Sequence, residues 1–203
     1  IGINGFGRIG RLILRALLEN YKDKIQVVAI NDLGSIETNA HLIKYDSTHG
    51  TLNHDVETSK DGFEISNQKI KVFAEKDPGK ISWGKVGADV VLECTGIFLD
   101  KSSAQNHITG GAKKVIISAP AKEVDFTIVQ GVNSNELKKN HNVISNGSCT
   151  TNCLAPVAMV LENNFGIEYG YMTTIHSYTG DQKLLDTLHK DLRRARSTEG
   201  AMI

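Results

Sequence analysis

Three closely spaced glycines near the start of the sequence constrain the fold more than any other feature. Gly5, Gly7 and Gly10 of NGFGRIG follow a short apolar run and open a helical pattern, RIGRLILRALLEN. In a turn from strand to helix, the first glycine permits a tight turn, the second lets a pyrophosphate approach the backbone, and the third lets helix and strand pack closely. The first amides of the helix can then bind phosphate oxygens. The opening residues are therefore predicted to form a strand–turn–helix unit that binds a dinucleotide.

An acidic residue follows at the spacing that a dinucleotide site needs. The run KIQVVAI (24–30) is expected to form a buried parallel strand that ends at Asn31 and Asp32. Asp32 lies 22 residues beyond Gly10, where a carboxylate can accept hydrogen bonds from the hydroxyls of an adenosine ribose. The same carboxylate would repel a 2′-phosphate, which favours NAD over NADP. The alternative is a glycine-rich turn with an unrelated aspartate, and the order of the elements favours the dinucleotide site.

Strands and helices alternate through the rest of the first 147 residues. Each strand-like run is short and is closed by small or turn-forming residues, and the helical stretch SSAQNHITGG separates two of them. This alternation predicts an α/β fold with a Rossmann-type doubly wound parallel sheet. Residues 50–75 alternate in polarity and predict an antiparallel hairpin at the sheet edge. Further strands are expected within ADVVLECTGIF (88–98), AKKVIISAPA (112–121), FTIVQGV (126–132) and NVISNGS (142–148).

The pattern changes after Cys149. TTNCLAPVAMVLENNFG has a helical apolar stripe that contains Pro156, so we expect a first helical turn and then a bend. IEYGYMTTIHSY (167–178) is strand-like, and the polar residues after it have no clean period. We therefore predict two domains, a dinucleotide-binding domain over 1–147 and the start of an α+β catalytic domain over 148–203. The sequence has no initiator Met and stops without a closing element, as expected of a fragment.

Charge and composition limit the classes of molecule that this protein is expected to bind. The 23 basic and 23 acidic residues cancel, so no net field is expected to attract nucleic acid or an anionic membrane. No apolar run approaches the roughly 20 residues that cross a bilayer. No signal peptide precedes the glycines, so a cytoplasmic location is expected. Three cysteines in 203 residues do not form the disulfide framework of a secreted protein.

Cys149 and Cys153 lie four residues apart in SNGSCTTNC and allow three interpretations. A disulfide is disfavoured in a reducing compartment. A zinc site needs about four ligands, and no other cluster of Cys or His has the spacing to complete one. The third interpretation is a nucleophile, because helix amides and the helix dipole at a strand-to-helix junction lower the pKa of a thiol such as Cys149. Cys153, one turn further on, is expected to face the core, and Cys94 is expected to be a buried apolar residue.

A cysteine nucleophile needs a base, and His176 is the best placed of the seven histidines. It ends the strand-like run GYMTTIH and is followed by a polar loop, from where it could reach the helix start that carries Cys149. Spacing alone leaves this pair of residues open. The histidines expected to be surface or structural residues are His41, His49, His54, His107, His141 and His189.

Several motifs in order now add a family resemblance. INGFGRIGR, AIND, ISAPA, SNGSCTTNCLAP, TTIHSYTGDQ and HKDLRRAR together resemble phosphorylating glyceraldehyde-3-phosphate dehydrogenase over essentially all 203 residues. The resemblance implies NAD-dependent oxidative phosphorylation of D-glyceraldehyde 3-phosphate to 1,3-bisphosphoglycerate in glycolysis, through a cysteine thioester and with inorganic phosphate. It also implies a homotetramer, with the polar loop 178–201 near a subunit interface. Members of this family are usually longer, which implies that the C-terminal part of the catalytic domain is absent.

Carried over position by position, the resemblance implies a role for each matching residue. Cys149 is the nucleophile and His176 activates it, and no metal is implied. The residues implied to contact NAD are Gly5, Gly7, Arg8, Ile9, Gly10, Asp32, Lys76 and Ser118. The residues implied to line the inorganic-phosphate pocket or to hold the substrate are Ser148, Cys149, Thr150, Thr179 and Arg194.

Two alternative functions remain open, and a third possibility is that the truncated chain binds NAD but does not turn over substrate. Erythrose-4-phosphate dehydrogenases share much of the pattern, although the HSYTGDQ loop is more similar to that of the triose-phosphate enzymes. The other alternative is a cysteine hydrolase or acyltransferase that uses a Cys–His pair, in which the glycine loop has no role in the reaction. It predicts an activity that does not depend on NAD.

Overall fold

The computed structural model describes residues 1–180 and 182–198. Backbone contacts divide the chain into two compact units, Ile1–Phe165 and Gly166–Ile203. The end of the predicted second domain and part of the predicted interface loop, 178–201, lie outside the described residues. Within the described part of the chain, no helix is long and apolar enough to span a lipid bilayer. The predicted domain boundary near residue 147 stays a prediction.

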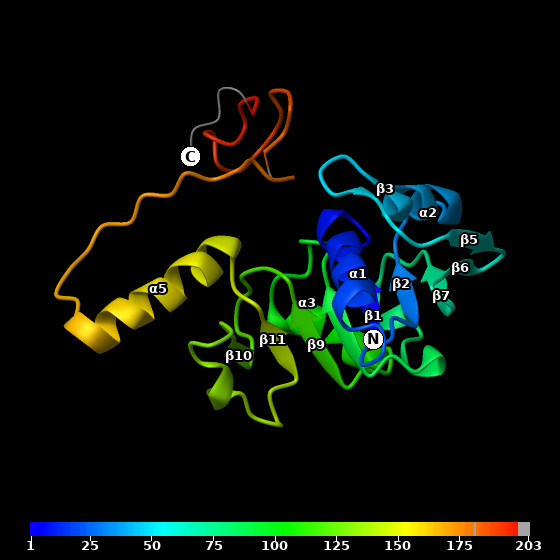
Figure 1. Cartoon of the computed structure of the whole chain (residues 1–203), viewed down its shortest axis with the longest axis horizontal. Coiled ribbons are helices and arrows are strands. Elements are labelled where there is room, and N and C mark those ends of the chain that lie inside the picture. The colour runs from blue at the N-terminus through cyan, green and yellow to red at the C-terminus, as the bar shows by residue number, and fades with distance from the viewer. Residues whose placement is uncertain (181, 199–203) are drawn as a thin grey trace. The chain divides into compact units, whose positions relative to one another are not determined.

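The first unit is built on a nine-stranded sheet, seven strands of which are parallel (Figure 1). Its centre is β1 (Gly2–Asn4), which pairs with β2 (Ala29–Asn31) on one side and β8 (Val90–Glu93) on the other. The strand order is β10-β11-β9-β8-β1-β2-β7-β6-β5. Because β7, β2, β1, β8, β9 and β11 follow in the order 3-2-1-4-5-6 of a doubly wound sheet, the predicted Rossmann-type fold is confirmed. The remaining parallel strands are β7 (Gln68–Phe73), β9 (Lys114–Ile117), β10 (Phe126–Thr127) and β11 (Val143–Ser145).

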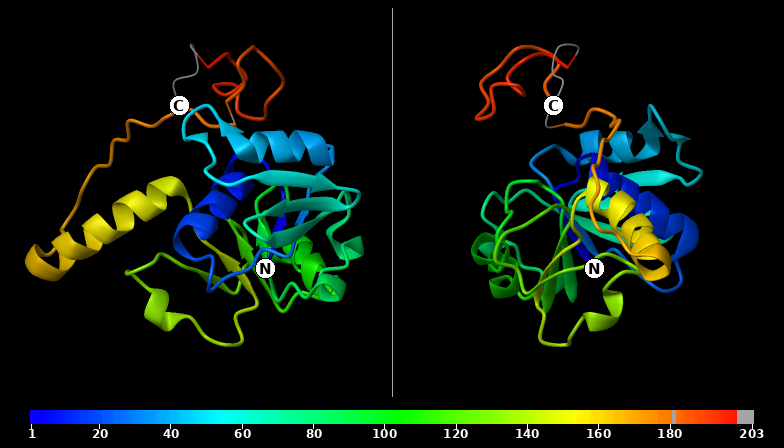
Figure 2. Two further views of the ribbon diagram at one scale, coloured as in Figure 1. Left: turned by 45° about the vertical axis from the view of Figure 1, so that its right-hand side comes forward. Right: turned by 90° about the vertical axis from the view of Figure 1, so that its left-hand side faces the viewer.

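The predicted edge hairpin is also confirmed. Strands β5 (Val56–Ser59) and β6 (Gly62–Ile65) pair antiparallel, and β6 pairs antiparallel with β7. Figure 2 shows these strands beside α2 (Ile36–Lys44), with which β5 and β6 are in contact. Strand β7 then joins the hairpin to the parallel sheet through β2.

Short elements connect the strands. The predicted helix over SSAQNHITGG forms as two single-turn helices, α3 and α4, and α1 forms over the whole predicted range. A small separate pair, β3 and β4, follows α2. These elements are α1 (Arg8–Asn20), α3 (Lys101–Ala104), α4 (Asn106–Thr109), β3 (Tyr45–Asp46), β4 (Gly50–Thr51) and the 3-10 helices Pro78–Lys80, Gly84–Val86 and Ser134–Glu136.

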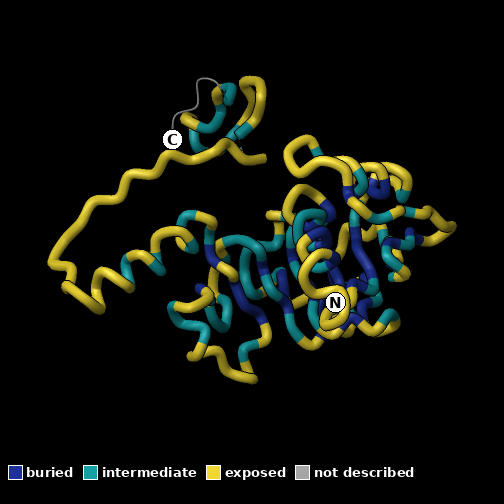
Figure 3. The backbone as a smooth tube through the Cα atoms, in the orientation of Figure 1, coloured by how far each residue is buried: buried dark blue, intermediate teal, exposed yellow. Residues whose placement is uncertain are grey.

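Both faces of the central sheet are buried. Ile3 of β1 and Ile30 of β2 pack in a cluster with Leu14 of α1. Ala29 of β2 and Val91 of β8 belong to a second cluster that includes Trp83 and Ile81. Since successive strand residues point to opposite faces, these two clusters cover the two sides of one sheet. Figure 3 shows the central strands as the buried part of the molecule.

Gly10 of α1 packs directly against the turn that precedes the helix. A Cβ atom at this position would lie 2.2 Å from the carbonyl oxygen of Gly5. Gly10→Ala is therefore expected to lower the free energy of unfolding by about 1–3 kcal/mol, because backbone must shift to admit the methyl group. Urea denaturation measures this change. Gly7→Ala is the matched control, since a Cβ there meets no atom within 4 Å, and an equal loss in both variants would contradict the packing argument.

The segment after the sheet differs from the sequence predictions. Helix α5 (Cys149–Phe165) continues through Pro156 beyond its first turn, and it contains no buried residue. Cys153 is exposed, so the prediction that it faces the core is wrong for this structure. Residues 167–178 are exposed and contain no strand, which contradicts the strand-like interpretation. An isolated strand leaves its amides and carbonyls unpaired, and the described residues of the second unit supply no partner strand.

Candidate active site

A cavity of about 530 Å³ opens at the carboxyl ends of β1, β2, β7 and β8. Ligands of doubly wound sheets bind outside the carboxyl ends of the strands, where the strand order reverses. That point lies here between β1 and β8. Of the residues predicted to contact a dinucleotide, the cavity brings together Gly5, Gly7, Asp32 and Lys76.

The glycine loop fits a pyrophosphate. Gly5 has φ +86°, and a Cβ there would lie 2.7 Å from the amide nitrogen of Thr95, so the position requires glycine. The space around Gly7 is open for 4 Å in the direction of a Cβ. Gly7 is also the N-cap of α1, which has no side-chain cap and no acidic residue in its first turn. The first amides of α1 are thus suited to an anion.

Asp32 holds the loops on both sides of the cavity. One carboxylate oxygen, Oδ2, accepts a hydrogen bond from the amide of Phe6 at 2.9 Å, and Oδ1 accepts one from the amide of Gly34 at 2.9 Å. Each oxygen of an ionised carboxylate has a second acceptor site. Asp32 can therefore fix the glycine loop and still accept hydrogen bonds from ribose hydroxyls.

Four other residues predicted to contact NAD do not line the cavity. Gly10 acts through packing, and Ile9 is 47% exposed on α1. The guanidinium of Arg8 forms an ion pair with Asp46. The backbone amide of His49 and the Arg8 side chain are among the groups that lower the pKa of the Asp46 carboxyl. The amide of Ser118 donates to the carbonyl of Glu93 at 3.0 Å, and contact of Arg8, Ile9 and Ser118 with NAD stays a prediction.

Part of the cavity wall consists of residues that carry no recognised cofactor motif in the sequence. The turn after β8 contributes a large share of it, although only the position of Asp32 after β2 was read as a ligand signal. The small polar residues that close the run VVLECTG could have given the same signal, because β8 also ends at this edge. The lining residues that were missed are Asn4, Asn31, Leu33, Glu75, Cys94, Thr95, Ile97 and Phe98.

Cys149 is the first residue of α5 and is exposed. Ser148 caps this helix, since its Oγ accepts a hydrogen bond from the amide of Thr151 at 2.9 Å. The Asn152 side chain donates to the carbonyl of Asn146 at 2.7 Å and fixes the approach of the chain. Ser148, Cys149 and Thr150 thus follow one another at the positive end of a helix dipole, which favours a thiolate and a neighbouring anion.

The other predicted catalytic residues lie in the unit Gly166–Ile203. His176 Nδ1 lies 2.6 Å from the carbonyl oxygen of Ser177. Only a protonated nitrogen can donate to a carbonyl, so the neutral ring has Nε2 as its acceptor nitrogen. The amide of Thr179 donates to Gln182 Oε1 at 2.6 Å, and Arg194 Nε lies 3.8 Å from Asp191 Oδ2. The convergence of His176, Thr179 and Arg194 on Cys149 stays a prediction.

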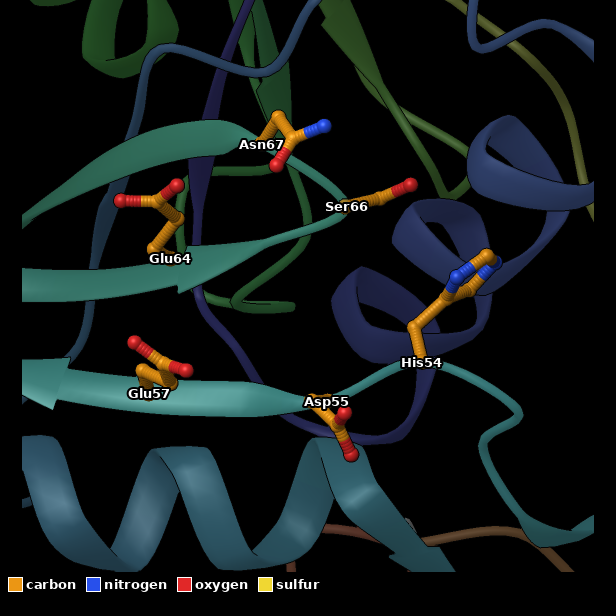
Figure 4. A pocket seen from close by; sticks show the side chains of 6 residues that line it. All are labelled: His54, Asp55, Glu57, Glu64, Ser66 and Asn67. Atoms are coloured by element: carbon orange, nitrogen blue, oxygen red, sulfur yellow. The ribbon is translucent and has the colours of Figure 1, made fainter.

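The alternative interpretations of the cysteines gain no support. Cys153 is a free cysteine in this structure. Within residues 1–180 and 182–198, no group of three or more His, Cys, Asp or Glu is arranged to hold a metal ion. A separate hollow of about 290 Å³ at the sheet edge is lined by His54, Asp55, Glu57, Glu64, Ser66 and Asn67 (Figure 4). Glu57 and Glu64 are cross-strand neighbours.

Cys94 lies at the cavity wall and is expected to be unreactive. Burial raises the pKa of its thiol to about 11, although a hydrogen bond with Ser118 acts in the opposite direction. At pH 8 roughly one thiol in a thousand is then the nucleophilic thiolate. Iodoacetamide at this pH should modify exposed Cys153 and spare Cys94, as peptide mass mapping would show. Equal labelling of both residues would contradict the effect of burial.

The doubly wound sheet, the glycine loop and Asp32 at a strand end define a dinucleotide-binding protein of the Rossmann class. Comparison with known families agrees with this class. Residues 1–101 match the family model described as glyceraldehyde 3-phosphate dehydrogenase, NAD binding domain, and residues 148–203 match the C-terminal domain of the same enzyme. The chain belongs to the glyceraldehyde-3-phosphate dehydrogenase family, and its first 101 residues match the NAD-binding domain of that family.

Curated relatives lead to the same family. Glyceraldehyde-3-phosphate dehydrogenase of Streptomyces coelicolor is 57% identical over 97% of this chain and 59% of the relative. Glyceraldehyde-3-phosphate dehydrogenase 1 of Bacillus cereus is 55% identical over 100% of this chain and 60% of the relative. Glyceraldehyde-3-phosphate dehydrogenase of Geobacillus stearothermophilus is 54% identical over 100% of this chain and 60% of the relative. The chain thus spans about three fifths of the length of the relatives it matches.

Proposed function

We propose that the full-length protein is an NAD-dependent phosphorylating dehydrogenase of D-glyceraldehyde 3-phosphate, and that this chain supplies its cofactor site and its nucleophile. The observation that carries the proposal is that one unit, Ile1–Phe165, contains both a dinucleotide cavity at a sheet switch point and a cysteine at a helix start. A dinucleotide site alone fits many oxidoreductases. An exposed thiol at the positive end of a helix adds covalent chemistry on a carbonyl.

In the proposed reaction, Cys149 Sγ adds to the aldehyde carbon and gives a thiohemiacetal. His176 takes the hydroxyl proton of this adduct as the carbonyl forms again. NAD, when bound, supplies the acceptor for the hydride that leaves the same carbon. The product on Cys149 is a thioester, which keeps the free energy of oxidation in an activated acyl group. Inorganic phosphate attacks the thioester carbon, 1,3-bisphosphoglycerate leaves, and the thiolate is restored.

The reaction needs two anion sites, one for the substrate phosphate and one for inorganic phosphate. Ser148 and Thr150 flank the thiol with hydroxyl groups at the start of α5, which suits the attacking phosphate. Thr179 and Arg194 are proposed to hold the phosphate of the substrate. The amide of Cys149 lies at the helix start and can donate to the oxyanion of the tetrahedral adduct.

The proposal extends to assembly and location. The full-length protein is proposed to be a homotetramer in the cytoplasm, with the polar loop that follows Tyr178 near a subunit interface. Its partners are glyceraldehyde 3-phosphate and inorganic phosphate, and neither nucleic acid nor a membrane has a part in the reaction. Sedimentation of the full-length protein as a monomer would contradict the assembly.

NADH formation tests the function. The full-length protein is incubated with NAD, glyceraldehyde 3-phosphate and phosphate, and NADH absorbance is recorded. Turnover that requires phosphate and is lost after thiol alkylation supports the dehydrogenase. A higher kcat/KM for erythrose 4-phosphate would favour the tetrose enzyme. Ester hydrolysis that is indifferent to NAD would favour a Cys–His hydrolase and overturn the proposal.

A further inference from the structure

A buried carboxylate lies directly behind the wall of the dinucleotide cavity. Glu93, the last residue of β8, is 1% exposed, and its side chain forms no ion pair with a lysine or arginine of residues 1–180 and 182–198. Among the ion pairs of the described chain, Glu93 takes part only in the one with His107, which is also fully buried and lies at 2.9 Å. A buried carboxylate without a cationic partner is costly unless neutral donors satisfy both of its oxygens.

Four donors satisfy Glu93. Oε2 accepts from Asn4 Nδ2 at 2.6 Å and from His107 Nε2 at 2.9 Å, whereas Oε1 accepts from the amide of Thr95 at 2.7 Å and from the Thr95 hydroxyl. The direction at His107 follows from Trp83, whose indole N–H lies 3.0 Å from His107 Nδ1. Because an indole nitrogen can only donate, Nδ1 is the acceptor and the ring hydrogen is on Nε2, toward Glu93.

The donors that meet Glu93 also form the cavity wall. Asn4 and Thr95 line the cavity, and Glu93 does not. The chain of hydrogen bonds continues from Asn4 Oδ1 to Asn31 Nδ2 at 2.7 Å, and Asn31 Oδ1 accepts from the amide of Glu75 at 2.8 Å. Asn31 and Glu75 are lining residues as well. One buried carboxylate therefore fixes residues from the ends of β1 and β8 directly, and residues from β2 and the turn after β7 through Asn4.

We propose that Glu93 is a positioning residue for the dinucleotide, which holds Asn4 and the Thr95 turn in the geometry that the bound ligand meets. This inference rests on the proposed function, in which the cavity binds NAD. Both oxygens of Glu93 need two donors each, so an incomplete network leaves a charge unsatisfied. The hydrogen bonds thus keep the cavity wall in one arrangement in the absence of ligand, which reduces the free-energy cost of ordering the wall when the ligand binds.

Glu93→Gln in the full-length protein tests the proposal. The amide group keeps the size of the carboxyl, but its NH₂ must face either the two donors of Thr95 or those of Asn4 and His107. Two hydrogen bonds to a charged group are lost, and the Kd for NAD, measured by calorimetry, is expected to rise about tenfold or more. Asp125→Asn is the matched control, since Asp125 accepts from Lys101 and from the amides of Asn142 and Val143 away from the cavity.

The control separates positioning from general stability. If Glu93 serves stability alone, both variants lower the midpoint of thermal unfolding and both keep the wild-type Kd. If Glu93 positions the wall, only Glu93→Gln raises Kd. An unchanged Kd in folded Glu93→Gln, or an equal rise in both variants, overturns the proposal.

A milder pair of variants covers the case in which Glu93→Gln does not fold. Thr95→Val removes the hydroxyl donor and should raise Kd several-fold, whereas Thr95→Ser keeps the donor and should restore the wild-type value. A double-mutant cycle with Glu93→Gln, where that variant folds, distinguishes direct from indirect action. If the change in log Kd of the double variant is smaller than the sum of the changes of the two single variants, Glu93 acts on the ligand through Thr95. If the changes are additive, this indirect action is overturned. If the wild-type protein does not bind NAD, the proposed function fails, and the role of Glu93 fails with it.

Discussion

Cys149→Ser is expected to lower kcat for NADH formation by on the order of 10⁴ or more, because the nucleophile is lost. A serine hydroxyl at the same helix start is a much weaker nucleophile than a thiolate and cannot form the thioester. The Kd for NAD should stay within a factor of about two, since Cys149 is not a lining residue of the dinucleotide cavity. Stopped-flow absorbance for turnover and calorimetry for NAD binding measure the two quantities on the same full-length protein.

Cys153→Ser is the matched control for this prediction. Cys153 lies on the same helix, is exposed, and differs from Cys149 chiefly in its distance from the helix start. The control variant should keep kcat within a factor of about two, because helix-dipole effects are confined to the first turn. Substantial turnover in Cys149→Ser would contradict the role of the nucleophile. A large loss of NAD affinity would show instead that Cys149 belongs to the cofactor site.

The parts of the fold that depend on neighbouring residues could be predicted from the sequence. Local geometry was sufficient for the glycines, because the positive φ of Gly5 and the close approach of Gly10 to the Gly5 carbonyl both lie within a pattern of six residues. The proximity of Thr95 to Gly5 depends on the sheet and does not follow from this pattern. The helix over residues 8–20 follows from its apolar period, and Asp32 follows from the end of a strand. The alternation of such units was sufficient to predict the doubly wound sheet.

The parts that depend on distant residues could not be predicted. Only the last two residues of the run 24–30 belong to the sheet, in β2 (Ala29–Asn31), since a strand extends only as far as its neighbours pair with it. Glu93 was not anticipated because its donors come from β1, α4 and the turn after β8, which the sheet order alone brings together. Cys153 and residues 167–178 were placed wrongly because burial and strand pairing both require partners that a local pattern does not show.

His176→Asn is expected to lower kcat by roughly 10²–10⁴, the usual contribution of a general base. Asparagine is close to histidine in size, and its amide can replace the donor that faces the Ser177 carbonyl. It offers no titratable nitrogen for the proton of the thiohemiacetal. The neutral ring in this structure has Nε2 as its acceptor nitrogen, which is the form that a base needs. A primary kinetic isotope effect with deuterated aldehyde should show that hydride transfer is the slowed step.

The same variant tests the ion pair between the two residues. An imidazolium beside Cys149 favours the thiolate, so its removal should raise the pKa of the Cys149 thiol and move the alkylation profile to higher pH. His41→Asn is the control, because His41 is exposed on α2 and its ring lies at a tilt beside the ring of Tyr45, with 4.9 Å between the ring centroids. An alkylation profile that is the same in wild type, His176→Asn and His41→Asn would rule out the pair, and helix α5 would then be the main source of thiolate stabilisation. An alkylation profile that moves in His176→Asn alone would support the ion pair, because a neighbouring charge shifts the pKa of a thiol strongly only within a few ångströms.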